Sequence, residues 1–107
     1  MQLKQKKLID WQKTGFNLKL IRNDNLNLRR YVCYYLRQQN GLCADNCDEC
    51  KFKMDSSISR AELAEVFGVS ESVVYNWETG KTPISIEDLL FFCDVAHLSL
   101  DDVLVYC

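Results

Sequence analysis

The sequence has little of what marks linkers, secreted proteins or membrane proteins. One proline and four glycines among 107 residues leave no long stretch with the composition of a linker. No apolar run approaches the roughly 20 residues that span a bilayer, and the N-terminus lacks the apolar segment of a signal peptide. These absences predict one domain in the cytoplasm, with no membrane partner.

Net positive charge is also missing, because 13 Lys/Arg stand against 15 Asp/Glu and give −2. The average hides an asymmetry, since residues 1–30 carry +6 and residues 31–107 carry −8. Such a split indicates a basic arm beside an acidic body, although a solvated amphipathic helix explains it equally well. We expect residues 1–25 to form a basic N-terminal arm or helix and residues 26–107 to form the main domain.

Catalytic side-chain combinations are absent as well. The chain has a single histidine, His97, which we expect on the polar surface, and no nucleophile–base or acid pair stands at catalytic spacing. We therefore expect no enzyme activity.

Cysteine, by contrast, is abundant, with six residues in a chain expected to be cytoplasmic. In a reducing compartment, clustered thiols point to a metal or redox site before a disulfide. Cys43, Cys47 and Cys50 are spaced so that a loop can bring three thiolates to one zinc ion, with Cys33 or Cys107 as the fourth ligand and His97 as a weaker candidate. Unliganded thiols and a redox or iron–sulfur site are the alternatives to zinc.

Signals for helix starts recur in the C-terminal half. Ser59, Ser85 and Ser99 are each followed three residues later by an acid, as in a capping box. Ser70 is a further cap candidate, and Gly80 marks a helix end. The predicted helices lie near 59–67, 70–78, 85–96 and 99–105.

Two further helices are predicted upstream. Apolar residues in 26–40 recur at i, i+4, i+7 and i+8, which predicts a helix. Thr14 is expected to cap a short helix that runs through Ile21, and residues 42–57 lack periodicity. No segment alternates as a strand, so the expected fold class is all-α with five to six helices.

The stretch RAELAEVFGVSESVVYNWETG, residues 60–80, has the spacing of a helix-turn-helix. Ala64 is small enough for two helices to approach closely, and Gly68 follows where a tight turn needs a positive φ. Val74 and Trp77 are then expected to point into the core. This arrangement holds the second helix so that its first residues can enter a DNA major groove.

Over residues 57–105 the chain resembles the phage-repressor-like XRE family of bacterial regulators, in SISRAELAEVFGVSESVVYNWETGKTP and SIEDLLFFCDVAHLSLDDVLV. The resemblance implies a sequence-specific transcriptional regulator that binds double-stranded DNA. With 26–40 as the family's first helix, the Cys-bearing residues 42–57 are an insertion between the first and second helices. DWQKTGFNLKLIR also resembles a family N-terminus, which keeps a second register open.

The resemblance implies two sets of DNA contacts. The groove-facing residues are Glu71, Ser72, Tyr75 and Asn76, and the phosphate contacts are Ser59, Arg60, Lys81 and Thr82. Asparagine can pair with adenine, and a carboxylate can accept from cytosine N4. Glu71 has a second interpretation, because negative charge also stabilises a helix N-terminus.

Three further expectations concern partners. The resemblance implies that Glu78 bonds an arginine of the first helix, with Arg30 and Arg37 as candidates. A homodimer would suit two-fold DNA sites; Phe91, Phe92, Leu98 and Val105 supply either its surface or core packing. The alternative functions are a protein-interaction module of the antitoxin or anti-repressor type, and a metal- or redox-responsive switch on the same fold.

Overall fold

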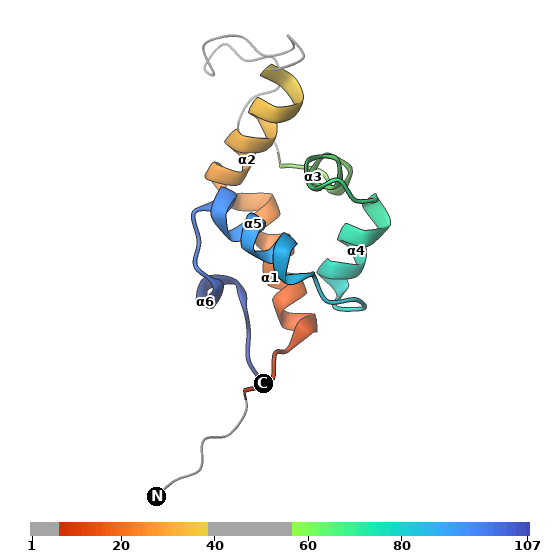
Figure 1. Cartoon of the computed structure of the whole chain (residues 1–107), viewed down its shortest axis with the longest axis vertical. Helices are drawn as coiled ribbons and strands as arrows, with labels where there is room; N and C mark the ends of the chain where they lie inside the picture. The colour runs from red at the N-terminus through yellow and green to blue at the C-terminus, as the bar shows by residue number, and fades with distance from the viewer. Residues whose placement is uncertain (1–6, 39–56) are drawn as a thin grey trace, which may run out of the picture.

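The computed structural model describes residues 7–38 and 57–107, which form six α-helices and one π-helical turn (Figure 1). The elements are α1 (Trp11–Asp24), α2 (Leu26–Cys33), the π-helical turn η1 (Tyr34–Gln38), α3 (Arg60–Phe67), α4 (Glu71–Thr79), α5 (Ile86–Ala96) and α6 (Leu100–Val103). The described residues contain no strand beyond an isolated bridge between Ile9 and Tyr106. The all-α class and the four predicted C-terminal helices are therefore confirmed.

Short polar side chains start the helices, as the sequence predicts. Ser59 and Ser99 form complete capping boxes, in which the serine and the acid three residues later each accept from the other's backbone N–H. Ser85 caps α5 by accepting from the N–H of Asp88, but the Asp88 carboxylate bonds the Ser85 hydroxyl instead of its backbone.

The prediction that Thr14 caps the first helix is wrong. α1 begins three residues earlier, where the Asp10 side chain accepts from the N–H of Lys13 at 3.0 Å. Thr14 is fully buried, and its hydroxyl accepts from the N–H of Val105 at 2.9 Å. It therefore ties α1 to the C-terminal segment instead of starting a helix.

A single apolar core is shared by all the α-helices. Ala64, Val74 and Trp77 lie in it, as the helix-turn-helix spacing predicts. The ring of Phe67 packs against this core, where it contacts the aromatic rings of Trp77, Phe91 and Phe92. The buried cluster comprises Leu18, Leu28, Val32, Ile58, Leu63, Ala64, Val74, Trp77, Ile84, Leu89, Phe92, Cys93, Val95, Ala96 and Val103.

Helix α1 lies between α4 on one side and α6 on the other (Figure 1). Two glycines allow α1 and α4 to approach closely. A Cβ on Gly15 would lie 2.1 Å from the carbonyl oxygen of Trp77, and one on Gly80 would lie 2.6 Å from Cα of Gln12. These distances are far below van der Waals contact, so the backbones meet directly at both points.

This packing corrects the expected order of helices. Residues 26–38 are helical as predicted, but they form α2, which packs against α3 and α5, and η1, which packs against α3. It is α1 that packs along α4 and occupies the place expected for the first helix. The second register, carried by DWQKTGFNLKLIR, is therefore the one that the packing favours.

The predicted arm and insertion fall partly outside the described residues. Residues 11–24 of the expected arm form α1, with Leu18 and Arg22 buried in the domain, while residues 1–6 are not described. Of the insertion, residues 42–56 are not described. Among the helices within the described ranges, none combines the length and apolarity needed to cross a bilayer.

Candidate nucleic-acid interface

The turn between α3 and α4 is built as the sequence predicts. Gly68 ends α3 with φ 69°, and the following N–H, of Val69, returns to the carbonyl of Ala64 at 3.0 Å. Ser70 then caps α4 through the N–H of Val73. Because Val74 and Trp77 are buried, the opposite side of α4 is left facing solvent.

That solvent-facing side contains one groove lined by six residues. They are Arg60, Glu71, Ser72, Tyr75, Asn76 and Lys81, all of which the resemblance implies as DNA contacts. The remaining two, Ser59 and Thr82, lie just outside it, at the cap of α3 and in the loop after α4. The structure thus brings the predicted reading residues together with two of the four predicted phosphate contacts.

Arg60 is held at the edge of this groove by two neighbours. Its Nε donates to Oε1 of Glu78 at 2.9 Å, and its guanidinium lies 5.1 Å from the ring centre of Tyr75. Among the described residues, Glu78 is its one hydrogen-bonding partner, so the terminal nitrogens remain available to a phosphate. Tyr75 is 49% exposed, and the contact with Arg60 restricts how its ring can turn.

Glu78 itself is buried and accepts from two arginines. Arg22 on α1 donates through Nε to Oε2 at 2.6 Å and through Nη2 to Oε1 at 3.1 Å. Arg22 also donates to the carbonyl of Ile58, the residue before the cap of α3. The expected partners Arg30 and Arg37 are therefore wrong, because they belong to α2 and η1, whereas α1 is the helix that packs on α4.

Arg22 is the supporting residue that the sequence reasoning missed. Its bonds fix the end of α4 and the entrance to α3 relative to α1, so the groove has a rigid frame. The sequence did contain a signal for it. The stretch DWQKTGFNLKLIR, which also resembles the N-terminus of the family, ends at Arg22.

Glu71 and Asn76 have different surroundings in the groove. Glu71 is the first residue of α4 and is exposed, while Asn76 is half-buried one turn further along. The carboxylate of Glu71, the hydroxyl of Ser72 and the amide of Asn76 all line the groove on one helix. Together they offer the hydrogen-bond donors and acceptors that read base edges. Exposed Lys81 follows the helix end and supplies positive charge at the rim.

The cysteine prediction stays untested for its main members. Cys43, Cys47 and Cys50 lie outside the described residues, and the remaining candidates Cys33 and Cys107 are respectively buried and exposed free thiols. Within the described ranges no three potential ligands cluster as a metal would require. The zinc ligand set therefore stays a prediction, and elemental analysis of protein purified without chelator is its direct test.

Cys93 and His97 have structural roles. Cys93 fills the core, and burial, aided by the nearby charge of Asp102, raises the pKa of its thiol. His97 is exposed and ends α5 with φ 57°, a conformation uncommon for residues other than glycine.

The residues proposed as a dimer surface are buried to different extents. Phe92 is 1% exposed and therefore belongs to the core. Phe91 meets Tyr31 and Phe67 edge to face, and Leu98 is half-buried against the core. Val105 is half-buried as well, so burial removes Phe92 alone from a possible dimer surface.

The fold and the groove can now be compared with known proteins. The family model described as helix-turn-helix matches residues 54–103, which include α3 to α6 and the groove. The comparisons with curated proteins and with solved structures gave no match.

Proposed function

We propose that the protein is a transcriptional regulator that binds double-stranded DNA in a sequence-specific manner. The proposal starts from residues 54–103, which form an XRE-type helix-turn-helix domain. Helix α4 enters the major groove with its N-terminal half. The observation that carries the proposal is the groove of Arg60, Glu71, Ser72, Tyr75, Asn76 and Lys81, in which reading and phosphate-binding chemistry adjoin on one face.

The proposed contacts follow from the chemistry of each side chain. Asn76 pairs with adenine through its amide, Glu71 accepts from cytosine N4, and Ser72 bonds either kind of base edge. Arg60 and Lys81 bind phosphates at the two rims and set the register of α4 on the duplex. Ser59 and Thr82, just outside the groove, extend these two phosphate contacts.

Electrostatics predicts that affinity for random DNA is low. The exposed carboxylate of Glu71 repels nearby phosphates, and the chain as a whole carries −2. Few phosphates are therefore neutralised, and the salt dependence of binding should be shallow compared with that of strongly basic regulators. Recognition then depends more on base contacts than on general attraction.

The experiment is selection of bound sequences from a random duplex pool, followed by affinity measurement on the selected site. We expect Asn76→Ala to weaken binding by about 10- to 100-fold, the value of one good base contact of 1–3 kcal/mol. Asn27→Ala, a matched change on α2 outside the groove, should leave affinity unchanged. If no sequence is enriched, the proposal is wrong.

A protein-interaction module is the second candidate, favoured by exposed acids on α5 and α6 such as Glu87, Asp94 and Asp101. The two functions differ in their response to random duplex at low salt. A DNA-binding domain retains measurable binding there, whereas a module for basic protein partners does not.

A further inference from the structure

Helix α1 presents an apolar stripe to solvent on the side opposite α4. Phe16 is 57% exposed and Leu20 is 43% exposed, and they lie one turn apart. Lys13 and Asp24 are also exposed and lie on the same face, at the two ends of the helix. The stripe is thus basic at its start, apolar in the middle and acidic at its end.

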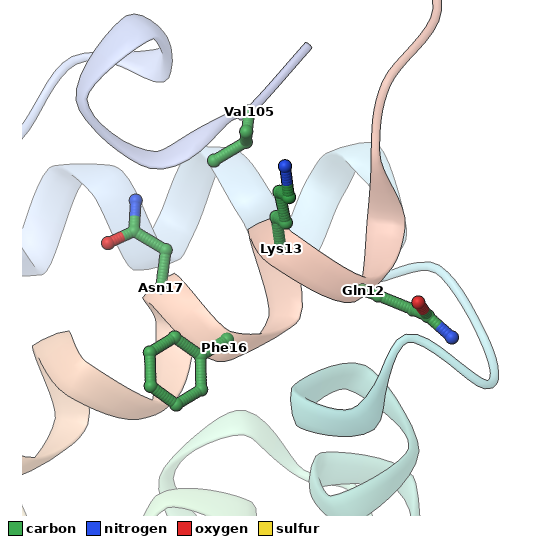
Figure 2. Close-up of a pocket in the computed structure, with 5 residues that line it drawn as sticks. All are labelled: Gln12, Lys13, Phe16, Asn17 and Val105. Carbon is green, nitrogen blue, oxygen red and sulfur yellow. The ribbon is translucent and has the colours of Figure 1, made fainter. Parts of the chain in front are cut away.

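Two surface hollows flank this stripe. The first is lined by Gln12, Lys13, Phe16 and Asn17 of α1, with Val105 of the C-terminal segment opposite them (Figure 2). The second is lined by Leu20, Ile21, Asp24 and Asn25, with Leu98 and Asp102 across from them. In each hollow, four consecutive-turn residues at i, i+1, i+4 and i+5 lie beside residues of the C-terminal part of the chain.

We propose that this face binds a second copy of the chain, with the two α1 helices packed antiparallel about a two-fold axis near residue 18. In an antiparallel pair, facing residue numbers have a constant sum. A sum of 36 places Phe16 opposite the partner's Leu20, and the same register brings Lys13 within one residue of the partner's Asp24. Both ends then pair opposite charges, as a two-fold interface requires of a self-complementary surface.

Asp102 strengthens this complementarity. It lines the second hollow beside Leu20 and Asp24, so two carboxylates lie at the acidic end of the stripe. The partner's Lys13 would approach both of them. Asn17 keeps the C-terminal segment in place, because its amide donates to the carbonyls of Asp102 and Val103, each at 3.0 Å.

A second exposed apolar pair, on α5, lacks this property. Ile86 is 61% exposed and Leu90 is 51% exposed on α5, and they are flanked by Glu87 and Asp94. A two-fold contact there would bring carboxylates together without any lysine on the same face. Charge complementarity therefore selects α1, and α5 provides a matched control.

The proposal concerns self-association and does not depend on DNA binding. Sedimentation velocity of the full chain in reducing buffer, without DNA, should show a concentration-dependent dimer. Phe16→Glu should weaken dimerisation about tenfold or more by placing a charge in the contact, while Ile86→Glu should leave it unchanged. A wild-type chain that stays monomeric, or a dimer disrupted by Ile86→Glu and not by Phe16→Glu, would overturn the proposal.

Charge reversal supplies a second test that does not rely on removing an apolar side chain. Lys13→Glu and Asp24→Lys should each weaken the dimer, and the double variant should restore it. Both changes place charges that favour the ends of α1, so neither should unfold the helix. Failure of the double variant to recover would contradict the antiparallel register, whatever the outcome of the DNA-binding experiment.

Discussion

Arg22 and Glu78 form a buried ion pair across 56 positions of sequence, with Nε to Oε2 at 2.6 Å and Nη2 to Oε1 at 3.1 Å. The two side chains are 8% and 3% exposed. Their pairing joins the first helix of the described chain to the end of the helix proposed to read DNA, so it is the frame on which the groove depends.

Arg22→Met should therefore destabilise the domain by about 3–5 kcal/mol, because it leaves part of a buried carboxylate uncompensated. Arg60→Ala removes the other arginine from Glu78 but should cost less, since the Arg60 side chain is 31% exposed. Urea unfolding of the two variants measures both effects. If the double variant Arg22→Met, Glu78→Met is no more stable than Arg22→Met alone, the explanation by an unpaired charge is wrong.

Gly15→Ala should also be destabilising, by about 3 kcal/mol, because overpacking a close contact usually costs 1–3 kcal/mol or somewhat more. The added Cβ would lie 2.1 Å from the backbone oxygen of Trp77 and 2.8 Å from that of Glu78. In an ordinary helix the same change stabilises by about 0.5–1 kcal/mol, so the sign of the effect is the test. Thermal unfolding measures it.

Gly68→Ala is the control for Gly15→Ala. A Cβ there meets no atom within 4 Å, but φ is +69°, so backbone strain alone should cost about 1–2 kcal/mol. A larger loss at Gly68 than at Gly15 would contradict the close approach of α1 to α4.

Glu71→Ala should relax the preference for one C·G pair by about tenfold, within the 1–3 kcal/mol of a good base contact. Ser70 already caps α4 through the N–H of Val73, so Glu71 is not needed for that bond. Binding to base-substituted versions of the selected site measures the preference. An unchanged preference with a lower melting temperature would instead assign Glu71 to stabilising the helix N-terminus.

Lys81→Ala should weaken binding to all sequences alike. Losing one phosphate contact lowers the slope of log affinity against log salt by about 0.9. Titrations of the selected site at several salt concentrations give the slope. A change in sequence preference, with no change in slope, would place Lys81 on a base edge instead of a phosphate.

Acid should weaken the cap of α6. Hydrogen bonds from the backbone N–H and then the hydroxyl of Ser99 lower the pKa of Asp102 below its ordinary value of 3.8. A lower pKa in the folded state means that the ionised carboxylate stabilises the fold at neutral pH, and this contribution is lost as the pH falls through 3.8 and below. Asp102→Asn should therefore melt below wild type at pH 7 and converge with it at low pH. Asp94→Asn controls for the general loss of one negative charge, and a difference between wild type and Asp102→Asn that persists at low pH would contradict the assignment.

Local signals made much of this fold predictable. Ser59, Ser70 and Ser99 each bond a residue three positions later in the chain. Both partners of each bond can therefore be recognised from a short stretch of sequence. The same holds for the turn at Gly68, whose positive φ follows from its place between two helical segments. For this reason the helices from α3 onward, and the burial of Val74 and Trp77, could be predicted without coordinates.

Long-range pairing was harder to predict. Residues 11–24 and 26–38 are both helical and both contain arginines, and the sequence alone does not say which helix packs on α4. The close approach at Gly15 decides it, and that contact depends on the backbone of residues more than sixty positions away. Thr14 was misassigned for the same reason, since its partner Val105 lies 91 positions along the chain.

The candidate site lies between these cases. Its six groove residues follow from helical periodicity on α4 and the resemblance of the surrounding motif. Their exposure is local, but the tether from Arg60 to Glu78 and Tyr75 depends on how two helices cross. The sequence therefore predicts which side chains face outward. Which of them are restrained by neighbouring side chains depends on the packing of the helices.

The distant partners of α1 have a consequence for how the protein is made. A ribosome releases this helix well before Glu78 and Val105 exist, and an isolated helix of 14 residues is only marginally stable in water. Nascent chains that stop early would thus leave Arg22 and Leu18, which the complete fold buries, exposed to solvent. Folding of α1 onto the domain therefore waits until residues as far along the chain as Val105 have been synthesised.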